Sequence, residues 1–216
     1  MALVAGLSSS AMNTETQDHW NRVYTTRAVD AVSWYQAQPK VSLELIAAAD
    51  LPVDAPIIDV GGGASVLADC LLAQGRSALS VLDISAAALA SARARLGADA
   101  SKARWIESDV REFAPSHRYD LWHDRAVFHF LTDRVDREKY MAALRCSLNP
   151  RGHVVIATFA LDGPARCSGL EVAHYDAASL HAQFGADFEM LESLRETHVT
   201  PSGAEQRFTW ARLRLR

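Results

Sequence analysis

The sequence has few cysteines, and they form no recognisable motif. Cys70, Cys146 and Cys167 are far apart, odd in number, and include no Cys-x-x-Cys pair. This pattern argues against a disulfide framework and against a zinc site, and it fits a reducing compartment. We therefore expect no bound metal and a cytoplasmic location.

Long apolar runs and an excess of positive charge are also lacking. No apolar stretch reaches the roughly 18 residues that a membrane-spanning helix needs, and the apolar start has no basic residues of the kind found in secretion signals. The net charge is −4 at pH 7, whereas nucleic-acid-binding surfaces are usually basic. These absences predict no membrane and no nucleic-acid partner, and they leave the oligomeric state open.

What the sequence does contain is an alternation of short apolar strands with helical segments. The expected strands before the C-terminal region are 56–60, 78–82, 103–107, 119–123 and 153–159. Such alternation predicts an α/β fold, with a Rossmann-like, mostly parallel sheet and helices on both faces. Two longer strands, 188–199 and 205–215, flank a turn with proline and glycine, which predicts an antiparallel C-terminal hairpin.

The N-terminal region differs from the rest in composition. Residues 1–17 are rich in Ser and Thr without apolar periodicity, so we expect a flexible tail followed by one domain over 18–216. Residues 18–50 hold several aromatic residues and a helical pattern after Pro39. We expect this segment to contain a first helix.

A glycine-rich turn follows the first expected strand, in Asp59-Val60-Gly61-Gly62-Gly63. Glycines let the main chain turn tightly and approach a ligand, and ligands of such sheets lie beyond the carboxyl ends of the strands. A turn of this kind is also a common strand-to-helix connection. Its meaning therefore depends on the neighbouring strand ends.

The next two strands also end in acidic residues. Asp83 lies about 20 residues beyond Gly63, where a carboxylate accepts hydrogen bonds from ribose hydroxyls; Ser85 is better placed to cap the following helix. Asp109 can accept from the amine of an adenine while the Val110 amide binds a ring nitrogen, although Asp109 also suits an ordinary turn. The three strand ends together indicate an adenosine-containing cofactor.

Two cofactors fit this layout, NAD(P) and S-adenosylmethionine. Val66 stands where the dinucleotide motif G-x-G-x-x-G has its third glycine. The Asp59 carboxylate would repel a pyrophosphate but attract a sulfonium and an ammonium group. The C-terminal hairpin, in place of a separate substrate domain, also favours S-adenosylmethionine.

These features resemble the class I S-adenosylmethionine-dependent methyltransferases over residues 18–216. The resemblance implies a seven-stranded sheet with an antiparallel last strand, S-adenosylmethionine as cofactor and S-adenosylhomocysteine as product. It implies that Asp59 lies near the methionine moiety, Asp83 near the ribose and Asp109 near the adenine. It also implies that residues 18–50 form a lid over the cofactor in addition to the first helix. The implied cofactor site consists of Trp20, Tyr24, Trp34, Asp59, Gly61, Gly62, Gly63, Asp83, Ile84, Ser85, Asp109, Val110 and Arg125.

The segment after the fourth strand carries the candidates for catalysis, His129, Asp124 and Arg125. His129 can serve as a general base or simply be a helix-surface histidine. Asp124 and Arg125 can form an ion pair framing the pocket, and Arg125 can bind an anionic acceptor. The run Trp122-His123-Asp124-Arg125-Ala126 loosely resembles a loop of thiopurine-type methyltransferases, with a histidine inserted. Cys167 is expected above the acceptor site, where an ordinary loop cysteine is the simpler reading.

The sequence thus predicts a methyltransferase that acts on a small molecule. A protein lysine methyltransferase is the alternative within the fold, and it would favour an acidic pocket residue such as Asp124. An NAD(P)-binding oxidoreductase would usually need a Tyr/Lys pair, which we do not find. A cofactor-binding regulator without turnover is a further alternative.

Overall fold

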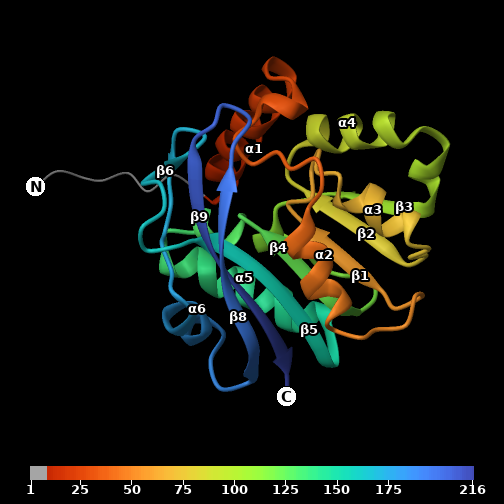
Figure 1. Cartoon of the computed structure of the whole chain (residues 1–216), viewed down its shortest axis with the longest axis vertical. Coiled ribbons are helices and arrows are strands. Elements are labelled where there is room, and N and C mark those ends of the chain that lie inside the picture. The colour runs from red at the N-terminus through yellow and green to blue at the C-terminus, as the bar shows by residue number, and fades with distance from the viewer. Residues whose placement is uncertain (1–8) are drawn as a thin grey trace, which may run out of the picture.

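The computed structural model describes residues 9–216, with side chains described from residue 14. A seven-stranded sheet is covered by helices on both faces (Figure 1). Its order is β3-β2-β1-β4-β5-β9-β8. The strands are β1 (Ile57–Val60), β2 (Leu79–Asp83), β3 (Ala103–Glu107), β4 (Tyr119–Arg125), β5 (Leu148–Phe159), β8 (Phe188–Val199) and β9 (Glu205–Leu215).

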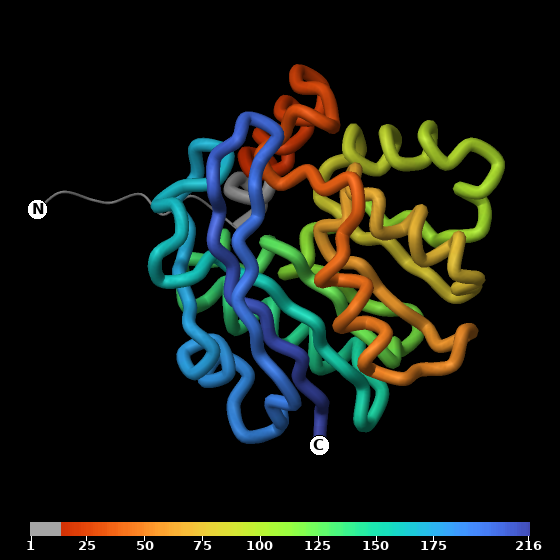
Figure 2. Tube along the Cα trace, in the orientation of Figure 1, coloured from red at the N-terminus to blue at the C-terminus, as the bar shows by residue number. Residues whose placement is uncertain are grey.

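The strands β1 to β5 are parallel, and β9 is inserted antiparallel between β5 and β8. The predicted mostly parallel sheet with a C-terminal hairpin is therefore confirmed. The helices are α1 (Ser9–Thr26), α2 (Lys40–Ala47), α3 (Leu67–Ala73), α4 (Ala86–Leu96), α5 (Arg134–Ser147) and α6 (Ala177–Phe184). The trace in Figure 2 shows α1 and the segment after it passing over one end of the sheet.

The core consists of two layers, one on each face of the sheet. One layer joins the sheet to α5 and α6 around Trp122 and Tyr140, which are both fully buried. The other joins it to α2, α3 and α4 around residues such as Phe159 and Trp210. Because burying one large apolar side chain stabilises a fold by about 1.5–3 kcal/mol, these layers hold the strand ends rigidly in place.

Strand order reverses at β1, which lies between β2 and β4. Ligands of doubly wound sheets bind at such a point, beyond the carboxyl ends of the strands. The glycine turn lies here, and Gly61 and Gly63 adopt φ values of +65° and +40°, which favour glycine. A Cβ added to Gly62 would lie 2.5 Å from Oδ2 of Asp59, so this glycine leaves room for the carboxylate.

Three segments differ from the sequence prediction. Helix α1 begins at Ser9, so residues 9–17 of the predicted flexible tail are helical, while residues 1–8 lie outside the described chain. Strand β5 begins at Leu148, because the chain continues directly from α5 through an irregular pairing with β4 and a left-handed Arg151. A short hairpin of β6 (Arg166–Cys167) and β7 (Leu170–Glu171), which was not predicted, follows β5.

Candidate active site

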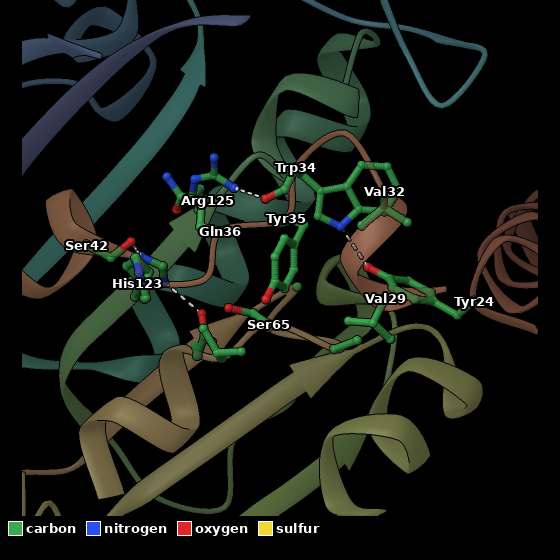
Figure 3. Close-up of a pocket in the computed structure, with 16 residues that line it drawn as sticks. Tyr24, Val29, Val32, Trp34, Tyr35, Gln36, Ser42, Ser65, His123 and Arg125 are labelled. Carbon is green, nitrogen blue, oxygen red and sulfur yellow. Dashed lines mark hydrogen bonds and ion pairs between the residues drawn. The ribbon is translucent and has the colours of Figure 1, made fainter. Parts of the chain in front are cut away.

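A cavity of about 410 Å³ lies over the carboxyl ends of β1, β2 and β4 and beside the turn after β3. Its size lies within the roughly 300–1,000 Å³ typical of small-molecule sites. A smaller cavity of about 50 Å³ adjoins it (Figure 3), and both share Tyr24, Trp34, Gly61 and Arg125. From the predicted cofactor set, the larger one is lined by Trp20, Tyr24, Trp34, Gly61, Asp83, Ile84, Asp109, Val110 and Arg125.

Asp59 and Gly62 line the smaller cavity, whereas Gly63 and Ser85 line neither. Ser85 is fully buried and caps α4, since its Oγ accepts a hydrogen bond from the Ala88 amide at 3.1 Å. Gly63 leaves room for the Asp83 carboxylate, because a Cβ at position 63 would lie 2.6 Å from Oδ2 of Asp83. Neither Gly63 nor Ser85 therefore contacts the cavities, but both help to position the residues that line them.

Asp83 lies at the end of β2 with only 6% of its surface exposed. Its Oδ1 accepts a hydrogen bond from the Ser85 amide at 2.8 Å. Burial, with a smaller contribution from the charge of Asp59, raises the pKa of Asp83 to about 7. A buried carboxylate of this kind gains stability from hydrogen-bond donors such as ribose hydroxyls.

Asp59 is buried and hydrogen-bonded to a residue that the sequence analysis did not assign to the site. Its Oδ1 lies 2.7 Å from Nδ1 of His123, and Nε2 of His123 lies 3.0 Å from Oγ of Ser42 (Figure 3). The network is satisfied if Ser42 donates to Nε2 and Nδ1–H donates to Asp59. His123 could have been found from strand register, because it is the β4 partner of Asp59 on β1.

Asp109 is engaged by Arg111, a residue absent from the predicted set. Both Asp109 oxygens accept from Arg111, and the Nη2–Oδ2 distance is 2.6 Å. Arg111 also pairs with Asp136 at 2.7 Å, and hydrogen bonding to Asp109 raises the pKa of the guanidinium. The Arg111 amide also donates to Oδ1 at 2.8 Å, so each Asp109 oxygen already accepts two hydrogen bonds. A carboxylate has about four lone-pair sites, so the orientation of Asp109 is fixed and an adenine amine would have to replace one of these bonds.

Three predicted aromatic residues form a cluster over the cavities. Trp20 packs edge-to-face against Trp34 and Phe130, with ring centroids 5.7 and 5.1 Å apart. Trp34 Nε1 donates to the Tyr24 hydroxyl at 3.2 Å. Burial raises the pKa of Tyr24, so this hydroxyl is neutral and can accept that bond. The cluster forms an apolar cover with one polar contact.

Helix α1 is attached to α4 by Asn21, another contact that the sequence analysis missed. Asn21 Oδ1 accepts from Ser85 Oγ at 2.8 Å and from the Ala87 amide at 3.3 Å. Gln17 adds a bond to the carbonyl of Ile84 at 3.1 Å. These polar contacts place the aromatic cluster beside the carboxyl end of β2.

His129 is placed by the structure away from both cavities. It is fully buried between the rings of Phe130 and Phe159, and its Nδ1 accepts from the Phe159 amide at 3.3 Å. Burial lowers its pKa to about 3. The geometry does not support the predicted general base, and the surface position considered as its alternative is wrong.

Asp124 is also buried within the protein, and it does not pair with Arg125. It accepts from the amides of Val127 and Phe128 at 2.8 and 3.1 Å and from the Tyr140 hydroxyl at 2.6 Å. Burial raises its pKa to about 6. Through these contacts Asp124 holds the loop after β4. The expected ion pair between Asp124 and Arg125 is absent, and Arg125 donates instead to the Trp34 carbonyl.

Cys167, which the sequence analysis expected above the acceptor, lies in the wall of the larger cavity. Burial raises the pKa of its thiol to about 12, so it is neutral. Within the described residues, no group of three His, Cys, Asp or Glu side chains is arranged to hold a metal. No helix in residues 9–216 has both the length and the apolarity needed to cross a membrane.

Known proteins share sequence and fold with this chain. Residues 57–152 match the family model described as "Methyltransferase domain". A malonyl-[acyl-carrier protein] O-methyltransferase of Ilyobacter polytropus is 29% identical over 104 residues, which are 48% of this chain and 37% of that protein. A ribosomal RNA small subunit methyltransferase C of Hamiltonella defensa is 29% identical over 143 residues, 65% of this chain and 42% of that protein. The chain thus spans about two fifths of the length of these relatives.

Solved structures share the fold over nearly the whole chain. A protein from a study of thioacetal formation in echinomycin biosynthesis has a TM-score of 0.74 at 17% identity, covering 92% of both chains. A methyltransferase of Anabaena variabilis has a TM-score of 0.72 at 16% identity, covering 95% of both chains. The 1,6-didemethyltoxoflavin-N1-methyltransferase of Burkholderia thailandensis has a TM-score of 0.69 at 20% identity, covering 100% of this chain and 92% of that one.

The sheet order and the cavity at its switch point define a Rossmann-like α/β protein with a site for an adenosine-containing ligand. Residues 57–152 match the model of a methyltransferase domain, and the fold of the chain is that of S-adenosylmethionine-dependent methyltransferases of known structure. The methyl donor of this class of domain is S-adenosylmethionine.

Proposed function

We propose that the protein transfers the methyl group of S-adenosylmethionine to a small molecule. The observation that carries this proposal is the continuity of the larger cavity. Its wall runs from the acidic strand ends at Asp83 and Asp109 to an apolar region at Phe130, Leu131 and Leu170. One cavity can therefore hold the cofactor and an acceptor side by side.

The residues at the acidic end fit the proposed donor. Asp83 would accept the ribose hydroxyls, and the Asp59 carboxylate lines the smaller cavity, where it attracts the positive charges of the methionine moiety. The faces of Trp20, Tyr24 and Trp34 suit a sulfonium. These roles rest on position, burial and charge.

Methyl transfer from a sulfonium is an in-line displacement, so positioning of the two reactants supplies much of the catalysis. The rigid strand ends would orient the donor, and the aromatic cluster would exclude water. We propose that residues 18–216 act as one domain and that residues 18–50 provide its lid. Since His129 and Asp124 do not line the cavities, the proposal assigns no general base.

Two observations favour a small acceptor over a protein lysine. Asp124, the acidic residue expected to favour a lysine, is fully buried and already accepts three hydrogen bonds. The acceptor end of the cavity is partly apolar and lies beneath the aromatic cluster. The structural relative from Burkholderia thailandensis was solved with 1,6-didemethyltoxoflavin and S-adenosylhomocysteine bound, which illustrates a small acceptor on this fold.

The test is methyl transfer from labelled S-adenosylmethionine into a cell extract separated into small metabolites and proteins. We expect the label in the metabolite fraction, and much less of it when the extract is incubated with the Asp83→Ala variant at subsaturating S-adenosylmethionine. Label confined to proteins would support the lysine alternative and contradict a small acceptor. A cytoplasmic location stays a prediction.

A further inference from the structure

Arg125 lies at the end of β4, at the junction of the two cavities. Its Nη1 donates to the Trp34 carbonyl at 2.9 Å, as Figure 3 shows, and its guanidinium lies over the Phe208 ring, 4.9 Å from the centroid. A bond at one end and a stacking contact on one face hold the guanidinium plane in a fixed orientation.

The opposite edge of this guanidinium has no partner. Nε and Nη2 are shielded from solvent and form no hydrogen bond with any residue in the described part of the chain. The nearby Glu196 carboxylate does not fill this role, because its oxygens accept from Gln36 at 2.9 Å and from Trp210 at 2.8 Å. Burial lowers the pKa of Arg125 to about 10, so the side chain remains charged at neutral pH.

The chemistry of the free edge points to a particular kind of ligand. Nε–H and one Nη2–H are parallel donors with the spacing of two carboxylate oxygens, so they bind a carboxylate in a bidentate manner. An unpaired buried charge is unfavourable, and a paired anion relieves this cost. Because neither nitrogen contacts solvent, the neighbouring side chains must shift when such a ligand enters.

The Arg125 side chain is directed away from the strand ends assigned to the cofactor. The carboxylates assigned to the cofactor, Asp59, Asp83 and Asp109, lie at the ends of β1, β2 and β3, on one side of β4. The Arg125 side chain extends the other way, across β5 to Phe208 on β9. The larger cavity that it lines also contains Cys167.

We propose that the free edge of Arg125 binds a carboxylate of the methyl acceptor, and that the acceptor is a small carboxylic acid with an apolar body. The apolar part would contact Phe130, Leu131 and Leu170, which line the same cavity. This inference rests on the proposed function, because it assigns a substrate class to the same site.

The experiment is a binding screen with small aromatic and aliphatic carboxylic acids, each paired with its amide, at saturating S-adenosylhomocysteine. Benzoate with benzamide and indole-3-acetate with indole-3-acetamide are two such pairs. We expect acids to bind the wild-type protein more tightly than their amides, by calorimetry and thermal shift. Arg125→Gln should weaken acid binding roughly 30-fold or more, because a buried charge pair loses one partner.

Matched variants separate this role from a general effect of charge or folding. Arg125→Lys keeps the charge but not the bidentate edge, and should bind acids at an intermediate affinity. Arg195→Gln removes a positive charge from an exposed side chain of β8 that lines neither cavity, and should leave both acid and S-adenosylhomocysteine affinities unchanged. Because Arg125 also donates to the Trp34 carbonyl, Arg125→Gln should weaken S-adenosylhomocysteine binding, but by far less than it weakens acid binding. The remaining S-adenosylhomocysteine binding also reports that the variant is folded.

Two results would overturn the inference. One is equal binding of acids and amides by the wild-type protein. The other is a loss of S-adenosylhomocysteine affinity in Arg125→Gln comparable to the loss for acids, which would assign the guanidinium to the carboxylate of the cofactor. If the wild-type protein does not bind S-adenosylhomocysteine, the proposed function itself fails. Cofactor binding without a preference for acids removes this inference alone.

Discussion

Asp83 combines a proposed binding role with a cost to stability. Burial raises its pKa from 3.8 to about 7, so the folded protein binds this proton more tightly than the unfolded chain does. Its contribution to stability is therefore most favourable below pH 4 and declines as the pH rises towards 7. Such a cost is typical of residues kept for binding, because the ligand supplies the missing donors.

Replacing Asp83 with Asn should therefore stabilise the protein without ligand while weakening its binding of S-adenosylhomocysteine. We expect the gain in unfolding free energy to be larger at pH 8 than at pH 5 by roughly 2–3 kcal/mol, since one pKa unit corresponds to about 1.4 kcal/mol. Urea denaturation at the two pH values measures this difference. An equal gain at pH 5 and at pH 8 would show that the pKa of Asp83 is not raised in the folded protein.

The hydrogen-bonded chain of Ser42, His123 and Asp59 makes a second prediction at the residue scale. His123→Leu leaves a carboxylate that is 2% exposed without its imidazole partner, and should destabilise the protein by roughly 2–4 kcal/mol. Ser42→Ala removes only the outer hydroxyl and should cost about 1 kcal/mol. Chemical denaturation of both variants measures the two losses, and equal losses would contradict this ordering.

Helix α1 illustrates how an element can depend on contacts that local sequence does not reveal. Residues 9–17 show no clear apolar periodicity, yet Gln17 and Asn21 on this helix bond to the segment around Ile84 and Ser85. Tertiary contacts therefore stabilise the helix where local pattern predicts a tail. In the short helical turn Phe128–Phe130, tertiary packing instead removed a residue from the predicted site. His129, which we expected near the acceptor, is buried against Phe159 on β5.

Asn21→Ala should loosen the attachment of α1 to α4. Losing two hydrogen bonds would cost about 1–2 kcal/mol, which corresponds to a five- to thirtyfold faster dissociation of S-adenosylhomocysteine if α1 covers it. Stopped-flow displacement measures this rate. Thr25→Ala is the matched control, because the Thr25 hydroxyl bonds only within α1 at its exposed end. A similar rate for both variants would exclude the proposed lid.

At the scale of the whole molecule, the mostly parallel sheet with its C-terminal hairpin could be predicted, whereas the strand order and most side-chain partners could not. Apolar alternation fixes which segments are strands, and parallel topology brings the ends carrying Asp59, Asp83 and Asp109 to one edge. His123, the partner of Asp59, depends on the register of β1 against β4, and Arg111, the partner of Asp109, also pairs with Asp136 on α5. The predicted role of Asp124 in the pocket was wrong for the same reason, because its carboxylate accepts a hydrogen bond from Tyr140 on α5.

The central claim is that the cavity at the carboxyl ends of β1 to β3 binds S-adenosylmethionine, and titration calorimetry tests it most directly. The account predicts that S-adenosylhomocysteine binds the wild-type protein with one site per chain, and that Asp83→Ala weakens this binding by roughly tenfold or more, as expected for the loss of hydrogen bonds to a charged group. Binding of NADH with no heat from S-adenosylhomocysteine would contradict the account.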